Sequence, residues 1–384
     1  MPKPSLKVNI NPEIIKWAIE SSGWTINEIS KRLKVNPILI NGWLNANEQP
    51  SLYQIKNLSR ALKRPLAAFF LPKPPKEIPL PQDFRMFPEK SMLFSKETLL
   101  TIRRARRLQS ISKELSENLS IDILPNIKKI DLSTNPEVIA FQERKNFGIK
   151  IEDQFNWKDS SEAFKIFKKL IEDKNILVFQ SSIPMKDARG FSLVDEYPFV
   201  IMINLKDSIE ARNFTLFHEY AHILLNESGV CIPERHIISE GKGTEIEKWC
   251  NEFAASFLIP KEEIKKDIEN ISKNRLIENE NISKFSHKYK ISKSAFLLRI
   301  LKLDIISQKN YEVKVAELKM LNRIPKGGGF PMPDKKCINE KGQKFISLVF
   351  KNFDSGKITT NDVLDYLSVK LKYLNDIRNI INIK

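Results

Sequence analysis

The stretch ARNFTLFHEYAHILLNESGV, residues 211–230, decides the fold of this chain. Two histidines, His218 and His222, stand four residues apart in it. On a helix this spacing places both imidazoles on one face about one turn apart, where they can bind one Zn²⁺. Glu219 follows the first histidine directly and suits a base that takes a proton from water, rather than a ligand. The apolar residues around the motif predict a buried helix over 209–225.

A catalytic zinc site needs a third protein ligand and an open fourth position. The segment IEKWCNEFAASFLIP, residues 246–260, predicts a helix that begins about two dozen residues after His222. Its inward stripe contains Asn251, Ala254, Ala255 and Leu258, and presents Glu247 at one end. Glu245 and Glu252 compete on spacing, and His236 is a weaker rival, so the spacing alone leaves the third ligand open.

Hydrophobic periodicity predicts the elements around these two segments. Three short β-rich runs, at 175–182, 190–196 and 198–205, predict a small sheet that follows a helix over 159–173. A substrate strand could pair with an edge of this sheet near 199–204. Further helical patterns cover 96–124, 245–258, 261–269, 282–303, 342–353 and 360–381. The glycines at 327–329 belong to a weak turn and strand region.

Both chemistry-bearing segments resemble the ImmA/IrrE family of zinc metallopeptidases, through FTLFHEYAH at 214–222 and EKWCNEFAASFLIP at 247–260. The resemblance implies that Glu247 is the third ligand, with Cys250 at a small position before Asn251. The upstream run RGFSLVDEYPFVIMINL, 189–205, fits the strands of that family. The resemblance implies a zincin-like fold and cleavage of a transcriptional repressor or regulator.

The N-terminal 60 residues carry a second pattern. Thr25 with Glu28 predicts a capped helix, and Asn36 followed by Pro37 predicts the start of a second helix after a turn of about three residues. Helix, tight turn and helix is the arrangement that lets the second helix enter a major groove. The order of motifs, including Trp43, resembles the XRE (Cro-type) helix-turn-helix.

That resemblance makes the start of the second helix the candidate DNA-binding surface, together with Thr25. The groove-facing candidates include no Arg, Lys or Gln, which are the usual bidentate base readers besides Asn. They are Asn36, Pro37, Ile38, Leu39 and Asn41. DNA binding is the favoured hypothesis, and a helical bundle that binds another protein or dimerises is the alternative.

The proline-rich segment and the two family resemblances divide the chain into parts. We expect an all-α helix-turn-helix domain over 12–71, a proline-rich linker over 72–95 with five prolines between 72 and 81, and a helical connector over 96–158. A metallopeptidase domain over 159–304 and a mostly helical C-terminal region over 305–384 follow. The segments IPLPQDFR at 78–85, KGGGFPMPD at 326–334 and 342–367 resemble family members that fuse both modules. The fold class expected is α+β, predominantly helical.

Composition sets outer limits on function. The 384 residues contain 63 Lys and Arg against 47 Asp and Glu, and this net charge of +16 permits contact with nucleic acid without establishing it. Arg103, Arg104, Arg106 and Arg107 predict a solvated helix face rather than a phosphate clamp. Three cysteines exclude a disulfide scaffold, and the absence of a signal peptide or apolar span predicts a cytoplasmic protein without a membrane partner.

Two functional hypotheses follow. In the first, Zn²⁺ held by His218, His222 and Glu247 supports peptide hydrolysis with Glu219 as the base, and the N-terminal module targets a repressor or its operator. In the second, the chain is a DNA-binding regulator, linked to a mobile element or a toxin-antitoxin pair, whose zinc is structural or sensory. The intact Glu219 favours the first, since a structural zinc needs no base beside its ligands.

Overall fold

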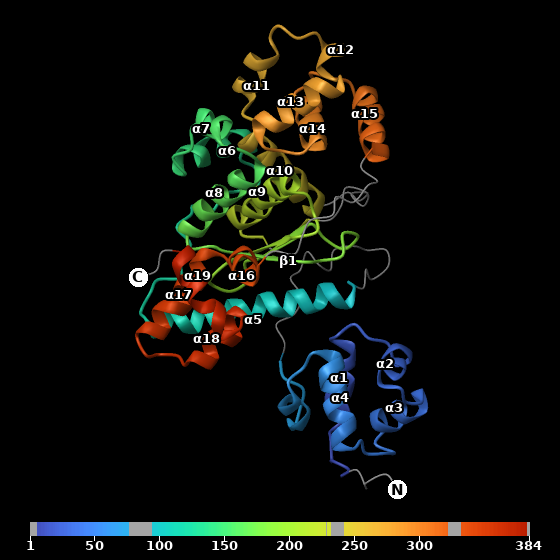
Figure 1. The fold of residues 1–384 in the computed structure, drawn as a ribbon. Helices are drawn as coiled ribbons and strands as arrows, with labels where there is room; N and C mark the ends of the chain where they lie inside the picture. Colours follow the sequence, from blue (N-terminus) through green and yellow to red (C-terminus); the bar gives the residue numbers. More distant parts are fainter. Residues whose placement is uncertain (1–5, 77–93, 228, 232–241, 322–331, 382–384) are drawn as a thin grey trace. The chain divides into compact units, whose positions relative to one another are not determined.

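The computed structural model describes residues 6–76, 94–227, 229–231, 242–321 and 332–381 (Figure 1). It divides into two units, one made of residues up to 80 with 87–104 and the other of residues 81–86 with 105–384. Helix α5, Lys96–Asn118, contributes to both units. Each unit is described by itself. The predominantly helical α+β class predicted from the sequence is confirmed.

The N-terminal unit is a helical bundle whose helices begin at polar caps. Thr25 and Glu28 form the predicted capping box of α2, and the Asn36 side chain accepts from the N–H of Ile38 at the start of α3. A buried core that includes Ile29, Ile40 and Trp43 joins the helices. The elements are α1 Pro12–Glu20, α2 Ile26–Leu33, α3 Pro37–Leu44, α4 Leu52–Leu62 and the 3₁₀ helix η1 Leu66–Phe70.

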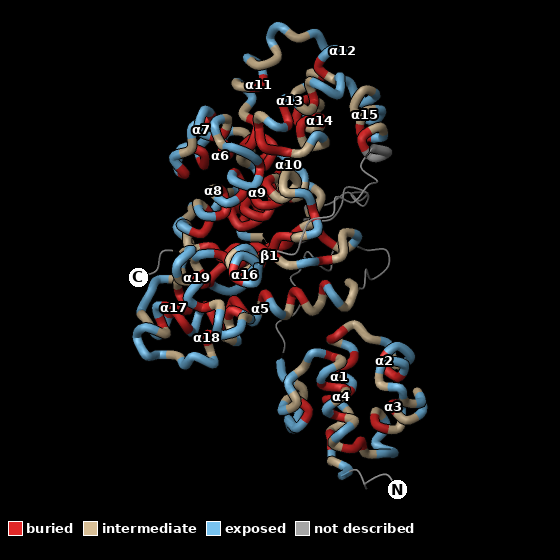
Figure 2. The backbone as a smooth tube through the Cα atoms, in the orientation of Figure 1, coloured by how far each residue is buried: buried red, intermediate tan, exposed pale blue. Residues whose placement is uncertain are grey.

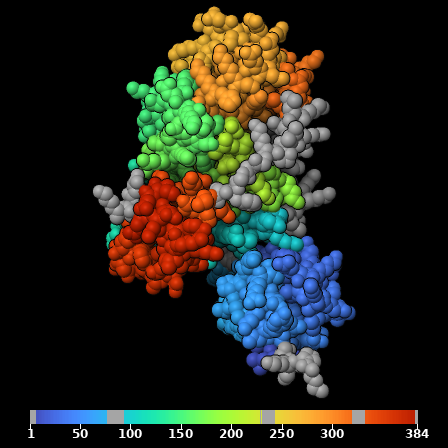
Figure 3. Space-filling view, in the orientation of Figure 1, coloured from blue at the N-terminus to red at the C-terminus, as the bar shows by residue number. Residues whose placement is uncertain are grey.

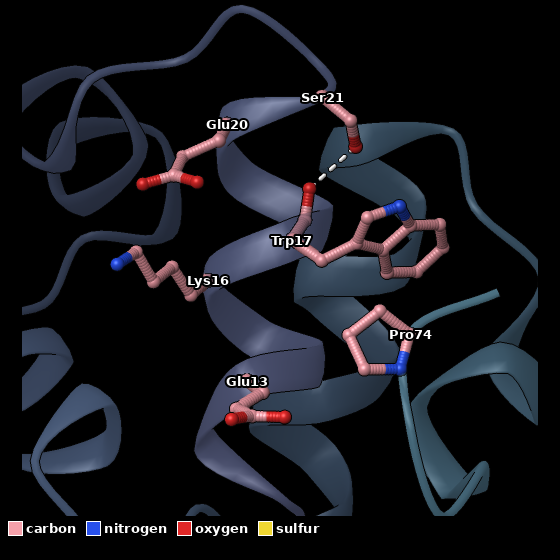
Figure 4. A pocket seen from close by; sticks show the side chains of 6 residues that line it. All are labelled: Glu13, Lys16, Trp17, Glu20, Ser21 and Pro74. Atoms are coloured by element: carbon pink, nitrogen blue, oxygen red, sulfur yellow. Dashed lines mark hydrogen bonds between the residues drawn. The ribbon is translucent and has the colours of Figure 1, made fainter. Parts of the chain in front are cut away.

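The start of the predicted proline-rich linker lies against α1. The Asn11 side-chain amide donates to the carbonyl of Pro72 at 2.9 Å, and Pro74 lines a shallow pocket with Trp17 and Ser21 (Figure 4). The guanidinium of Arg64 lies 4.4 Å from the centroid of the Trp17 ring. Residues 72–76 therefore extend the bundle, whereas the rest of the expected linker up to 93 lies outside the described residues.

The second unit is organised around a four-stranded sheet with the order β1-β3-β2-β4. Its strands are β1 Leu177–Ser181, β2 Gly190–Leu193, β3 Val200–Asn204 and β4 Val230–Cys231. β3 pairs in parallel with β1 and antiparallel with β2. The expectation that a substrate strand could pair near 199–204 is wrong, because β3 lies inside the sheet and both of its edges are occupied.

Helices cover both faces of this sheet. Alternate residues such as Val178, Ile201 and Ile203 belong to the large core shared with α8 Ser160–Asp173, α9 Ile209–Leu225 and α10 Lys242–Leu258. On the opposite face, the Phe179 ring meets the Phe345 ring edge-on at 5.6 Å. Figure 2 shows the resulting concentration of buried residues along α9 and the strands. Burial on both faces explains why the strands read as nearly continuous apolar runs.

The remaining helices of this unit frame the core. The predicted single helix over 282–303 is wrong, because Lys290 adopts a left-handed conformation with φ 60° and separates two helices. The weak turn and strand region predicted around residues 327–329 lies outside the described residues. The helices are α6 Pro136–Asn146, α7 Ile151–Asn156, α11 Lys261–Ile268, α12 Lys273–Leu276, α13 Asn279–Tyr289, α14 Lys293–Lys302, α15 Gln308–Leu321 and α16 Pro333–Lys341.

The C-terminal helices pack on the sheet through a buried ionic corner. Lys168 of α8 donates to the carbonyl of Asn339 at 3.0 Å near the end of α16, and Glu172 accepts from the N–H of Lys344 at 3.4 Å at the start of α17. Each charge thus faces the helix end of opposite partial charge. The elements here are α17 Gln343–Asp354, α18 Thr360–Leu367, η4 Leu371–Tyr373 and α19 Leu374–Ile380. In Figure 3 the atoms of this part of the chain are red and lie next to the green atoms of the part that contains α8. The expected helix over 360–381 is interrupted at Ser368, which has φ 56°.

The arginine group of α5 is not one uniform solvated face. Arg106 and Arg107 pair with Asp195 and Asp365, and Arg103 donates to the carbonyl of Leu62 at 3.2 Å. Arg104 is exposed. The two ion pairs with Asp195 and Asp365 attach the second part of α5 to the β2–β3 turn and to α18. None of the helices in the described ranges is both long and apolar enough to cross a membrane.

Candidate metal centre

Helix α9 carries the HEYAH motif in the interior of the second unit. Its N-terminus is capped by Ser208, which accepts from the N–H of Ala211 at 3.2 Å, and it ends at Asn226 in the left-handed conformation. His218, Glu219 and His222 are each at most 1% exposed. The helix predicted over 209–225 is therefore confirmed to the residue, and its two histidines face one point.

Helix α10 brings Glu247 to that point. Glu247 Oε2 lies 3.2 Å from His218 Nε2, and Glu247 Oε1 lies 3.2 Å from His222 Nε2. The two imidazole Nε2 atoms are themselves 3.2 Å apart. Glu245 and Glu252 are exposed, and His236 lies outside the described residues. Of the acids that spacing left open, the structure brings only Glu247 to the histidines.

These three side chains fit a zinc ion. A tetrahedral zinc with bonds of about 2.0–2.1 Å separates its ligand atoms by about 3.3 Å. The two Nε2 atoms, 3.2 Å apart, have this separation, and each lies 3.2 Å from a different oxygen of the Glu247 carboxylate. Two imidazoles with one carboxylate form a common donor set of catalytic zinc. In the described part of the chain, His218, His222 and Glu247 form the group able to hold a metal ion.

The outer nitrogens of the two histidines have different surroundings. Asn251 Oδ1 lies 3.0 Å from His218 Nδ1, so an N–H at Nδ1 donates to it and the lone pair of Nε2 faces inward. His222 Nδ1 has no hydrogen-bond partner among the described residues. Its ring instead lies against the backbone of Gly229, where an added Cβ would come within 2.4 Å of three ring atoms. The absence of a side chain at Gly229 therefore makes room for the His222 ring.

The carboxylate of Glu219 differs from the other side chains of the site in its surroundings. Neither carboxylate oxygen has a hydrogen-bond partner within the described ranges, although the residue is fully buried. Burial raises the pKa of Glu219 to about 7, and the nearby His222 and His218 oppose this rise. For Glu247 the two histidines outweigh burial and hold the pKa well below its usual range. One acid is thus poised to exchange a proton while the other stays anionic.

The candidate DNA-binding residues lie in the other unit. Asn36, Ile38 and Asn41 are exposed on α3, and Ile38 is 75% exposed. Pro37 and Leu39 are only half-exposed. Thr25 is engaged in the capping box, where its hydroxyl donates to Glu28 at 2.9 Å. The exposed α3 surface is therefore short, uncharged and partly apolar.

Sequence reasoning missed two residues that contact the site, Ser192 and Gly229. Ser192 is the polar exception in the buried strand β2, and Gly229 follows a helix end without any periodic pattern around it. The Gly229 N–H donates to Ser192 Oγ at 3.1 Å. The sequence offered one indication of these contacts, a single serine in an otherwise apolar strand.

Comparison with known proteins agrees with this geometry. Residues 171–301 match a peptidase-family model described as an IrrE N-terminal-like domain. The matched range contains both histidines, Glu219 and Glu247, and it supports a zincin-like metallopeptidase of the ImmA/IrrE type in this part of the chain. No curated protein matches the chain.

Proposed function

We propose that this chain is a zinc-dependent metallo-endopeptidase. The observation that carries the proposal is the meeting of His218, His222 and Glu247: the two Nε2 atoms are 3.2 Å apart, and each lies 3.2 Å from one oxygen of Glu247. Beside them lies the buried Glu219, whose carboxylate has no hydrogen-bond partner among the described residues. When bound there, zinc would polarise a peptide carbonyl and acidify water at neutral pH.

The side chains have separable tasks in this proposal. His218 presents Nε2 because Asn251 holds the Nδ1 proton, and Glu247 supplies the anionic ligand. Glu219 accepts the proton of the attacking water on a carboxylate oxygen and returns it to the departing amine. Glu219 is buried beside the ligands and has no other hydrogen-bond partner among the described residues, which leaves its carboxylate available for both transfers.

The substrate we propose is a transcriptional repressor or regulator, on the strength of the ImmA/IrrE resemblance. The N-terminal unit would direct the enzyme to that protein or to its DNA. Residues 6–76 contain eleven Lys and Arg against four Glu, which favours contact with phosphates. Because the exposed side chains of α3 carry no charge, we propose that any DNA binding is weak and dominated by the backbone.

The alternative is a DNA-binding regulator whose zinc is structural or sensory. A structural zinc site usually closes its fourth position with a protein ligand. Among the described residues the metal-binding group has three members, and the side chain beside it is a buried acid without a partner. Such an acid costs stability and is typical of catalysis rather than of a structural site.

The test compares the zinc-loaded protein with its Glu219→Gln variant on purified candidate repressors. The amide is nearly isosteric and Glu219 is no proposed ligand, so the variant should keep its fold and about one zinc per chain. Loss of the base should slow cleavage by about 10²–10⁴-fold. Glu252→Gln, on the exposed side of α10, serves as the matched control and should cleave normally. Equal cleavage by the Glu219→Gln variant would refute the assignment.

A further inference from the structure

Ser192 is fully buried in β2 and makes two hydrogen bonds to Gly229, one through its backbone and one through its side chain. Its N–H donates to the carbonyl of Gly229 at 3.0 Å, and its Oγ accepts from the N–H of Gly229 at 3.1 Å. A serine hydroxyl has one proton to donate and can also accept. Since the contact with Gly229 uses Oγ as acceptor, the hydroxyl proton must point elsewhere.

The face of β2 that carries Ser192 is turned toward α9. Side chains two residues apart in a strand lie on the same face, so Ser192 shares its face with Gly190. At Gly190 an added Cβ would lie 2.7 Å from Thr215 Cγ2 and 3.4 Å from Glu219 Cγ, which shows how closely α9 approaches. Phe191 and Leu193 belong to the opposite face. The strand therefore carries the Ser192 hydroxyl on the face that Glu219 approaches at Gly190, and the two side chains interact.

The carboxylate of Glu219 lacks a hydrogen-bond donor, and the Ser192 hydroxyl can supply one. Both of its oxygens are without a hydrogen-bond partner among the described residues. Catalytic hydrogen bonds are often long before substrate and metal are in place. A buried acceptor and an uncommitted donor thus face each other.

We propose that Ser192 is a positioning residue for Glu219: its hydroxyl donates to one carboxylate oxygen and leaves the other free to take the proton of water. The inference rests on the proposed base role of Glu219. Gly229 fixes the direction of the hydroxyl and also lies against the ring of His222. One short segment therefore orients both the base and a metal ligand.

The first experiment observes the carboxylate itself on metal-free protein. Infrared difference spectra between each protein and its Glu219→Gln counterpart isolate the carboxylate band of Glu219 at alkaline pH. We expect the band to shift in Ser192→Ala. Ser192→Thr and Ser192→Val have the same shape but differ in the hydroxyl, so Thr should retain the native band and Val should not. This pair decides the matter even where Ser192→Ala fails to fold.

The second experiment measures cleavage of a repressor by the zinc-loaded proteins. Loss of one hydrogen bond to a charged group should lower kcat about tenfold in Ser192→Val, with KM unchanged and with Ser192→Thr close to wild type. In the Glu219→Gln background, Ser192→Val should have no further effect. A carboxylate band that is identical in Ser192→Thr and Ser192→Val overturns the inference. A shifted band without any cleavage by wild type supports the contact and refutes the proposed function instead.

Discussion

Gly229→Ala tests whether the strand beside α9 determines the position of a metal ligand. Gly229 has no positive φ, so alanine is compatible with its backbone conformation. The new Cβ would lie 2.4 Å from three atoms of the His222 ring, whereas ordinary contacts begin at 3.4 Å. The ring or the strand must therefore move by about 1 Å.

Such a displacement is large for a metal site. Metal–ligand distances tolerate only about 0.2 Å, and changes outside the ligands themselves typically reduce metal affinity by about 10–100-fold. Because this change acts directly on a ligand ring, we expect a loss near 100-fold, which corresponds to about 2.7 kcal/mol. If the His222 ring moves and the backbone at Gly229 stays in place, zinc affinity should fall while the protein remains folded.

Competition titration with a chromophoric zinc chelator measures the affinity, and circular dichroism of the metal-free proteins reports the fold. Gly42→Ala is the matched control, since its added Cβ would meet Glu48 only at 3.5 Å. Zinc affinity equal to that of wild type in a folded Gly229→Ala protein would refute the reasoning, because the ring would then have room that the structure denies it.

Three further predictions concern the ligand, the C-terminal corner and the N-terminal unit. Glu247→Ala should abolish stoichiometric zinc by metal analysis while Glu245→Ala keeps it, and the reverse result would show that the third ligand is wrongly assigned. Burial raises the pKa of Glu172 from its ordinary 4.5 to about 7, so its unfolded form ionises first and wild-type stability should fall as pH rises through this interval. Urea unfolding of Glu172→Gln should lack that part of the decline, and an unchanged pH profile would contradict the raised pKa. Binding of the full chain to duplex DNA should be weak and fall steeply with salt in gel-shift titrations, and tight, salt-insensitive binding to one sequence would contradict it.

The parts of the fold that sequence predicted well are those with a strong local cause. The helix over 209–225 has a serine cap, an apolar stripe and an asparagine at its end, and it was predicted at its observed bounds. The α2 and α3 starts follow from Thr25 and Asn36 in the same way. Glu247 was one of several acids on one helix, and spacing alone did not distinguish it. The family resemblance pointed to Glu247, and the packing of α10 against α9 brings it to the two histidines.

The failures have equally physical reasons. Lys290 adopts a left-handed conformation, which is usually occupied by glycine or asparagine at the end of a helix. Because a lysine stands there, the sequence does not indicate the break between α13 and α14. Strand order depends on contacts between distant segments, and periodicity could not reveal that β3 is internal. Ser192 and Gly229 act through one tertiary contact, which has no counterpart in spacing.

The contacts of Lys168 and Glu172 with the C-terminal helices determine where this chain can be shortened without loss of packing. The segment that matches the peptidase family begins at residue 171, after Lys168, and ends at 301, before the helices that Lys168 and Glu172 contact. A shortened chain with only that segment would lose one of these charges, leave the other without its helix end and expose the Phe179 ring. The segment matched by the family model is thus shorter than the part of the second unit that these contacts hold together, and the C-terminal helices pack on the sheet as members of that unit.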